Sequence, residues 1–167
     1  DLPYPMYNRT YYESDDMLLG ISKQTVNLVK NVLKDKPKED WQINYVPHGI
    51  DPKKFYPIKG GTEELALKGF KEKYLGDEEY DFVMLWNSRN IRIKNMSDIV
   101  LAWRTFLDQL PVEKAKKCCL LMKTEISSEH GTDLNAVVET FCDPEIHKVK
   151  FVTDRLDDKG MNYLYNS

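Results

Sequence analysis

The run Phe82-Val83-Met84-Leu85-Trp86 is apolar at every position. A strand that is covered on both faces of a parallel sheet has this pattern, whereas a strand with one solvated face alternates between apolar and polar residues. A second such run follows at residues 118–122, and residues 149–152, Val-Lys-Phe-Val, predict a further strand. We therefore predict three buried strands of a parallel sheet in this part of the chain.

The segments around these runs have the periodicity of amphipathic helices. In the first of them, Leu65, Phe70 and Tyr74 share one helical face. Helices are predicted for four segments: residues 62–75, 95–110, 134–141 and 157–165. Strands and helices then alternate at the spacing of right-handed βαβ crossovers. The predicted fold class is α/β, with a Rossmann-like parallel sheet and flanking helices.

The chain before residue 62 has a different organisation. An apolar run at residues 15–21 predicts a strand, Ser22 is placed to cap a helix that ends before Pro37, and residues 43–46 predict a second strand. Chain-breaking residues then concentrate within a short stretch: Pro47, Gly49, Pro52, Pro57, Gly60 and Gly61. This concentration predicts a domain boundary, with residues 1–50 on one side and residues 51–167 on the other.

Composition excludes several classes of protein. The 167 residues include 24 Lys and Arg against 27 Asp and Glu, a formal net charge of -3. This charge lacks the basic excess that nucleic-acid binding requires, so we expect no nucleic-acid partner. No apolar run approaches the ~18 residues of a membrane span. The odd count of three cysteines, two of them adjacent, argues against a disulfide framework and favours a cytoplasmic location.

Common enzyme signatures are missing from the sequence. Inspection finds no GxGxxG, GxxxxGK[ST], GxSxG, HExxH or CxxC pattern. The three histidines, His48, His130 and His147, share no spacing that indicates a metal site. We therefore expect neither a metal nor another cofactor.

One loop carries a concentration of basic residues. In the segment WNSRNIRIKN, residues 86–95, a predicted strand ends and Arg89, Arg92 and Lys94 follow before the first acid at Asp98. Ligands of open α/β sheets bind at the carboxyl ends of the strands, where helix N-termini also present N–H groups. A diphosphate would fit there. The alternative interpretation is that these three side chains are solvated loop charges.

Together with its surroundings, this loop resembles a known family. The segment VPHGIDPKKFYP at residues 46–57, followed by a strand and an Arg separated by four residues from Lys, is similar to the retaining glycosyltransferases of the two-Rossmann-domain (GT-B) type, family 4-like, which use nucleotide-sugar donors. The resemblance implies that Arg89 and Lys94 act as catalytic residues that stabilise the leaving diphosphate. It further implies sugar transfer with retention of configuration and without a metal.

The same resemblance assigns domains and further site residues. Residues 1–50 would be the tail of an acceptor-side domain with its linker, and residues 51–167 the first half of the nucleotide-sugar-binding domain. The implied donor-binding residues are Arg89, Lys94, Asn95, Lys123, Thr153, Asp154, Arg155 and Leu156. Arg92 lies between the matched positions. The partners would be a nucleotide-sugar donor and a glycan, lipid or protein acceptor.

The sequence also departs from the family pattern. Ser88 stands where a Gly often precedes the Arg, and the segment with two spaced Glu residues and a Gly-rich turn does not follow residue 167. We therefore expect a fragment of a longer enzyme that is inactive by itself and that associates through an incomplete sheet edge. Two alternatives remain at this stage: a noncatalytic nucleotide-binding or interaction module that completes a separate subunit, and a nucleotide-sugar epimerase of similar fold.

Overall fold

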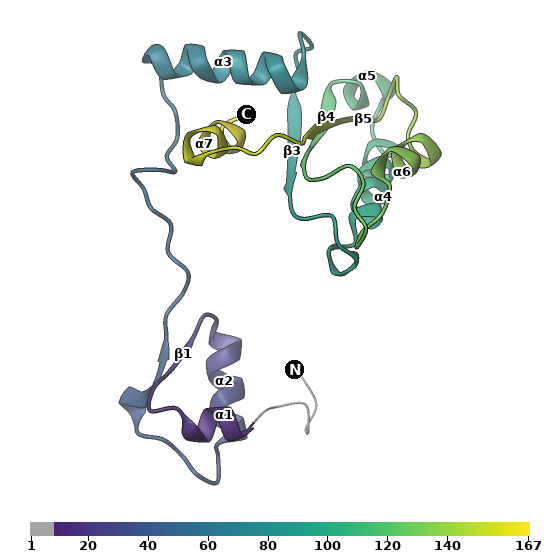
Figure 1. Cartoon of the computed structure of the whole chain (residues 1–167). Helices are drawn as coiled ribbons and strands as arrows, with labels where there is room; N and C mark the ends of the chain where they lie inside the picture. Colours follow the sequence, from purple (N-terminus) through teal and green to yellow (C-terminus); the bar gives the residue numbers. More distant parts are fainter. Residues whose placement is uncertain (1–8) are drawn as a thin grey trace. The chain divides into compact units, whose positions relative to one another are not determined.

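The computed structural model describes residues 9–167, which belong to two compact units (Figure 1). The first unit is Asp1–Asp51 and the second is Pro52–Ser167. The first eight residues of the predicted N-terminal part lie outside the described residues. The predicted assignment of residues 1–50 and 51–167 to two domains of a larger enzyme is not tested by this division and stays a prediction.

The first unit contains a two-stranded parallel sheet and helices that pack on it. Ser22 begins the longest of these helices, because its Oγ accepts a hydrogen bond of 3.0 Å from the backbone N–H of Thr25. The buried core consists of Val29, Leu33 and Ile43. The elements are α1 (Arg9–Ser14), β1 (Leu18–Gly20), α2 (Lys23–Val32), the 3-10 helix η1 (Asp40–Gln42) and β2 (Ile43–Tyr45).

The second unit is built on a three-stranded parallel sheet in the order β3-β4-β5. Its elements are α3 (Gly61–Leu75), β3 (Phe82–Asn87), the 3-10 helix η2 (Arg92–Lys94), α4 (Met96–Leu107), α5 (Val112–Ala115), β4 (Cys118–Lys123), α6 (Leu134–Phe141), β5 (Lys148–Val152) and α7 (Asp158–Tyr165). Among the described residues, no helix combines the length and apolar character that crossing a bilayer requires.

Helices cover both faces of this sheet (Figure 1). Alternate residues of β4 point to opposite faces: Leu120 and Met122 join a core with Trp103 of α4 and Leu134 of α6. On the other face, Cys119 and Leu121 of β4 pack with Leu75 of α3 and Leu164 of α7. The predicted α/β fold with a parallel sheet and flanking helices is therefore confirmed.

Strand β3 is less buried than the sequence predicts. Strand β3 pairs only with β4 within the described residues, so it is an edge strand. Its first residue, Phe82, is 47% exposed, and residues 83–86 are only half-buried. Full burial was predicted from the unbroken apolar run, but an edge strand leaves one flank of each side chain uncovered.

The chain changes faces after β5. Both earlier crossovers pass through α4 and α6 on one face, whereas α7 lies with α3 on the opposite face. Helix α7 also reaches the carboxyl end of β3, where Asn87 Nδ2 donates a hydrogen bond of 3.0 Å to the Tyr165 hydroxyl. In open α/β sheets ligands bind outside the carboxyl ends of the strands. The functional site is therefore sought at this end of the sheet.

The start of the second unit is docked rather than free. The backbone N–H of Tyr56 donates to Asn162 Oδ1 at 3.0 Å, and that of Ile58 donates to Asn166 Oδ1 at 2.9 Å. Asn166 Nδ2 returns a hydrogen bond of 3.1 Å to the carbonyl of Tyr56. The two asparagines are four residues apart and share one face of α7. The stretch of chain-breaking residues that predicts a domain boundary is thus bound to α7 at residues 56 and 58.

Removal of the Asn162 amide should loosen this fastening. Asn162 is 4% exposed, so Asn162→Ala leaves the N–H of Tyr56 without its acceptor and should lower the free energy of unfolding by about 1–3 kcal/mol. Hydrogen exchange at the Tyr56 amide should accelerate more than exchange in β4. Unchanged exchange at Tyr56 in a folded variant would contradict this role.

Burial of Cys119 predicts a loss of stability at high pH. Burial, the largest cause, raises the pKa of the Cys119 thiol from 9.0 to about 12. The folded chain therefore holds this proton more tightly than the unfolded chain, so the stabilisation is complete below pH 9.0 and disappears as the pH rises toward 12. Urea unfolding at about pH 7 and about pH 10 measures the loss of unfolding free energy between the two pH values. This loss should be smaller in Cys119→Ala than in the wild type. Equal losses in the two proteins would refute the assignment.

Candidate functional site

The carboxyl ends of the three strands of the second unit meet at one edge. The register pairs Asn87 with Lys123 and Lys123 with Val152. Arg89 therefore follows β3, Lys123 ends β4 and Thr153 follows β5 along the same edge of the sheet. The strand pairing brings together the three regions in which site residues were predicted.

The loop between β3 and α4 holds the predicted phosphate-binding residues. Arg89, Arg92 and Lys94 are all exposed. Within residues 9–167, no carboxylate forms an ion pair with any of the three. Asn95 ends η2 and begins α4 with a φ of 47°, the left-handed conformation that Asn tolerates better than most residues. The loop thus presents three unpaired cations before the N-terminus of a 12-residue helix.

A cavity of about 230 Å³ lies where this loop meets the loop between β4 and α6. Its lining residues come from both loops and from the first turn of α4: Asn90, Ile91, Arg92, Asn95, Met96, Ser97, Asp98, Gly131 and Thr132. Of the predicted donor-binding residues, Asn95 lines this cavity, whereas Arg89 and Lys94 do not. Arg92, which the family comparison left between the matched positions, is the basic residue that does.

Asp154 is engaged by helix α3. Its Oδ2 accepts hydrogen bonds from Lys73 Nζ at 2.6 Å and from the Tyr74 hydroxyl at 2.7 Å. The bond from Lys73, the largest cause, lowers the pKa of Asp154 below its ordinary value, and the charge of Lys123 contributes in the same direction. The reciprocal bond to Asp154 raises the pKa of Lys73 to about 12. The predicted role of Asp154 toward a ligand stays a prediction, but its carboxylate already has two donors.

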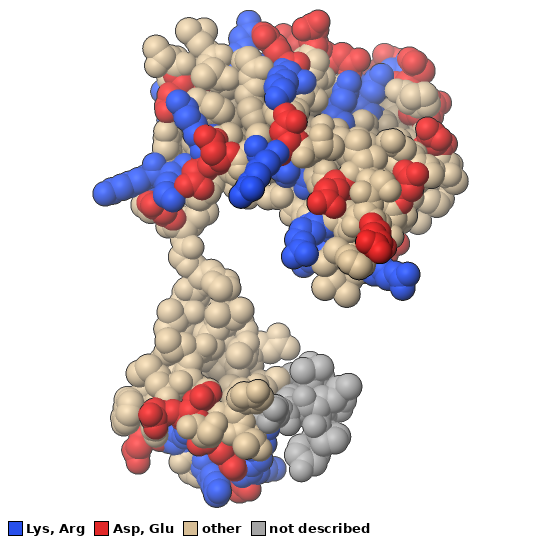
Figure 2. Space-filling view, in the orientation of Figure 1, with Lys and Arg blue, Asp and Glu red and all other residues tan. Residues whose placement is uncertain are grey.

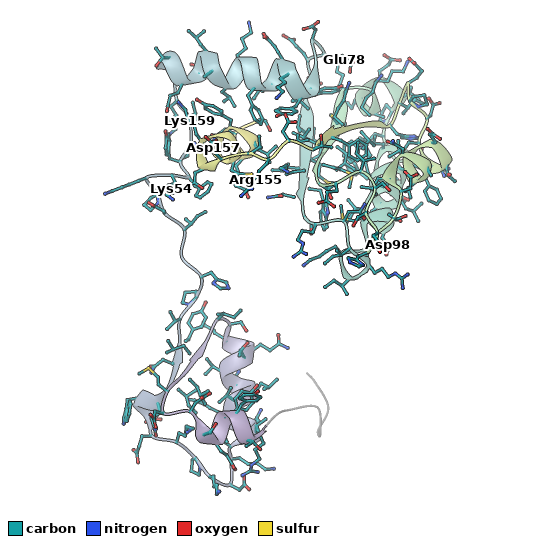
Figure 3. The ribbon with its side chains drawn as sticks, in the orientation of Figure 1. Lys54, Glu78, Asp98, Arg155, Asp157 and Lys159 are labelled. Atoms are coloured by element: carbon teal, nitrogen blue, oxygen red, sulfur yellow. The ribbon has the colours of Figure 1, made fainter. Side chains whose placement is uncertain are left out.

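The other predicted residues after β5 lie on the segment that leads into α7. Thr153 and Arg155 are exposed, and Leu156 is half-buried against the core that Leu164 belongs to. Figure 3 shows Arg155 just before Asp157, which caps α7 by accepting a hydrogen bond of 2.7 Å from the N–H of Gly160. Arg155 has no ion-pair partner in the described part of the chain.

Lys123, at the end of β4, is half-buried. Its backbone carbonyl accepts a hydrogen bond of 3.2 Å from the N–H of Ser88, which carries the pairing of β3 and β4 one residue beyond the strands. Its charge acts on the carboxylate of Asp154. Lys123 therefore lies between the loop of Arg89 and the segment of Asp154.

The visible surface has no continuous basic patch, and the described residues form no metal-binding cluster. Figure 2 shows basic and acidic side chains interspersed over the visible face of the second unit, in contrast to the continuous basic surface of a protein that tracks a polyanion. Among residues 9–167, no group of three or more His, Cys, Asp and Glu side chains is placed to hold a metal ion. The expectations of no nucleic-acid partner, no metal and no cofactor stay predictions.

Comparison with known proteins supports the fold and no family. No protein-family model matches the chain, and no curated protein matches its sequence. A similar solved structure is the N-terminal domain of trehalose-6-phosphate phosphatase from Candida albicans, with a TM-score of 0.62 and 13% sequence identity. The match covers 91% of this chain but only 36% of that one. At this identity the likeness shows the α/β fold alone.

These findings overturn the glycosyltransferase interpretation. The similar structure is described as a domain of a phosphatase, and no family model supports the resemblance. The predicted family, sugar transfer with retention and the assignment as a glycosyltransferase enzyme are therefore wrong, and neither the epimerase nor the noncatalytic module gains specific support. The motif of Arg, four residues and Lys is too short to separate one Rossmann-like protein from another.

The ion pair of Asp154 with Lys73 gives a direct test of the site geometry. Asp154→Asn should return the pKa of Lys73 from about 12 toward its ordinary 10.5, because the charged acceptor of its hydrogen bond is lost. Titration of the Lys73 side chain by NMR measures this shift. Asp158→Asn, which removes the partner of Lys54, is the matched control and should leave Lys73 unchanged. An unchanged pKa of Lys73 in Asp154→Asn would show that the Asp154 carboxylate does not bind Lys73.

Proposed function

We propose that the second unit binds a phosphate-bearing small molecule at the carboxyl edge of its sheet. The observation that supports this most is the set of basic side chains without ion-pair partners in residues 9–167 that the edge carries: Arg89, Arg92, Lys94 and Arg155. Lys123 adds a half-buried cation between them. Like charges on neighbouring loops repel one another, and a bound polyanion relieves that repulsion.

The residue types suit phosphate. The planar guanidinium of Arg can bind two phosphate oxygens at once, whereas Lys contributes a compact point charge. Arg89 and Lys94 would hold one phosphate group in this proposal, and Asn95 and Arg92 would face it from the cavity of about 230 Å³. The overall net charge of -3 makes the basic character local, which favours a small ligand.

The rest of the ligand would lie toward the segment after β5. Thr153 and Arg155 offer exposed polar groups there, and Leu156 offers a half-buried apolar surface. Asp154 would contribute only by reorienting from Lys73. Nucleoside diphosphates, nucleotide sugars and sugar phosphates all combine a phosphate with such a polar remainder. The phosphatase in the comparison is named after a sugar phosphate, trehalose 6-phosphate, which is therefore a suitable probe.

The proposal includes a cytoplasmic location and no metal or other cofactor. All three cysteines lie in the described part of the chain, and all are free. Cys118 and Cys119 are buried, and burial raises the pKa of both thiols. Unpaired thiols are typical of reducing compartments. Association through the incomplete sheet edge at β5, which pairs only with β4 within the described residues, also stays part of the proposal.

Titration with inorganic pyrophosphate tests the phosphate site. Arg89→Ala and Lys94→Ala should each weaken binding by about tenfold, because each removes a charge-assisted hydrogen bond. The control is Lys114→Ala, which removes an exposed cation before β4, at the opposite edge of the sheet. Affinity should also fall as salt is added. Calorimetry that finds no pyrophosphate binding, or equal binding by all four proteins, would reject the proposal.

A second set of titrations identifies the remainder of the ligand. Uridine diphosphate is compared with uridine, and trehalose 6-phosphate with trehalose. Binding of the phosphorylated compound alone in both pairs indicates recognition of phosphate. Tighter binding of one phosphorylated compound than of pyrophosphate assigns that ligand class to the segment of Thr153 and Arg155.

A further inference from the structure

A buried asparagine joins the two loops of the site. Asn90 is 2% exposed, although it lies in a loop between two charged residues of the candidate site. Its Nδ2 donates to the backbone carbonyls of Thr132 at 2.7 Å and Glu125 at 3.0 Å, with a longer contact to Ile126 at 3.3 Å. Its Oδ1 accepts a hydrogen bond of 3.1 Å from the N–H of Thr132. Every polar atom of this side chain is therefore used on the opposite loop.

The opposite loop is shaped to receive this side chain. A Cβ at Gly131 would lie 2.1 Å from Asn90 Oδ1 and 2.4 Å from the Asn90 carbonyl oxygen. Both distances are far below a van der Waals contact, so only glycine permits the approach. The requirement comes from close packing of the two loops, because the φ of Gly131 is not in the left-handed region.

Backbone hydrogen bonds flank the asparagine on both sides. Before it, the N–H of Ser88 donates to the Lys123 carbonyl at 3.2 Å; after it, the N–H of Arg92 donates to the His130 carbonyl at 3.0 Å. The loop from Ser88 to Arg92 is thus attached at every second residue, first to the last residue of β4 and then to the loop after it. Arg89 lies inside this attached stretch.

We propose that Asn90, seated against Gly131, is a positioning residue that sets the place of Arg89 and Arg92 at the ligand site. This inference rests on the proposed phosphate-binding function. Asn90 does not bind the ligand through its amide, because all of its polar atoms are occupied. It fixes the width of the cavity of about 230 Å³, whose walls include Arg92 on one loop and Gly131 and Thr132 on the other.

The physical reason is the geometry that phosphate recognition needs. A binding group must be held within about 0.5 Å of its productive position to contribute fully. Exposed Arg side chains have many rotamers, so their backbone must be fixed for them to converge on one anion. A buried amide with several hydrogen bonds supplies that rigidity, since moving the loops apart would leave the buried Asn90 amide without partners.

Two variants from opposite loops test the proposal. Asn90→Asp keeps the side-chain shape but loses both N–H donors and turns a carboxylate toward three carbonyls. Gly131→Ala adds one methyl group on the other loop. Each should weaken pyrophosphate binding by about tenfold while the protein stays folded. The control for stability is His147→Ala. His147 is 6% exposed and links Asp108 and Asp143 at the amino edge of β5, away from the ligand site.

The melting temperature and the pyrophosphate affinity together separate a positioning role from general destabilisation. His147→Ala should lower the melting temperature yet bind pyrophosphate like the wild type. Wild-type affinity in folded Gly131→Ala or folded Asn90→Asp would overturn the positioning role, as would an equal loss of affinity in His147→Ala.

Hydrogen exchange separates this inference from the proposed function. Gly131→Ala should accelerate exchange at the amides of Arg92 and Thr132 together, because one attachment holds both loops, whereas His147→Ala should not. If the wild type binds no pyrophosphate but these amides respond together, the proposed function fails and the attachment of the loops stands. If the wild type binds and the amides of Arg92 and Thr132 respond independently, the positioning inference fails.

Discussion

The parallel pairing of β4 with both of its neighbours is the constraint on which the second unit depends. Residues 118–122 of this strand are buried, and four of them, residues 119–122, are fully enclosed. A parallel ladder cannot be closed by a tight turn, so every connection must travel back across a face of the sheet. The chain meets this requirement with crossovers through α4 and α6 on one face, while α3 before the first strand and α7 after the last cover the other face. All three strands consequently release their loops at the same edge.

Beyond the ends of β3 and β4, side-chain hydrogen bonds take over from the strand pairing and hold the two loops together. The Asn90 amide bonds to several backbone groups of the facing loop, where a sheet would have backbone-to-backbone hydrogen bonds. The cost is a close approach that only a glycine at position 131 allows. In the proposal above, this contact holds the backbone from which the exposed cations Arg89 and Arg92 project toward the ligand.

The sequence predicts the parts of this structure that local pattern determines. An unbroken apolar run located β4, the pattern Val-Lys-Phe-Val at residues 149–152 located β5, and helical periodicity located α4 and α6, because burial on one or both faces is visible in the order of residues. Leu65 shows where this fails: periodicity grouped it with Phe70 and Tyr74, which pack beside Leu75 against the core, yet Leu65 itself is 72% exposed. The structural roles of Asn90, Asn162 and Asn166 could not be predicted from local sequence pattern. Their partners are 35 or more residues away, and an asparagine in a polar segment is ordinarily a surface residue. The family resemblance failed for a related reason, since short motifs around sheet ends are shared by many Rossmann-like proteins.

The cations of the edge have no ion-pair partner among residues 9–167, although the chain has more acidic than basic residues. Two carboxylates of the second unit are engaged by other side chains. Asp154 binds Lys73 and Tyr74 on α3, and Asp108 binds His147 and Arg104. Asp98, which lines the cavity, lies in the first turn of α4, where the helix dipole stabilises a carboxylate without a counter-ion. Exposed ion pairs contribute little to stability, so leaving Arg89, Arg92 and Lys94 unpaired costs the fold almost nothing. In the proposed function the same side chains would gain more from a phosphate, which offers several charged oxygens at once. The charge pattern of this edge is therefore compatible with the proposed ligand at little cost to the stability of the fold.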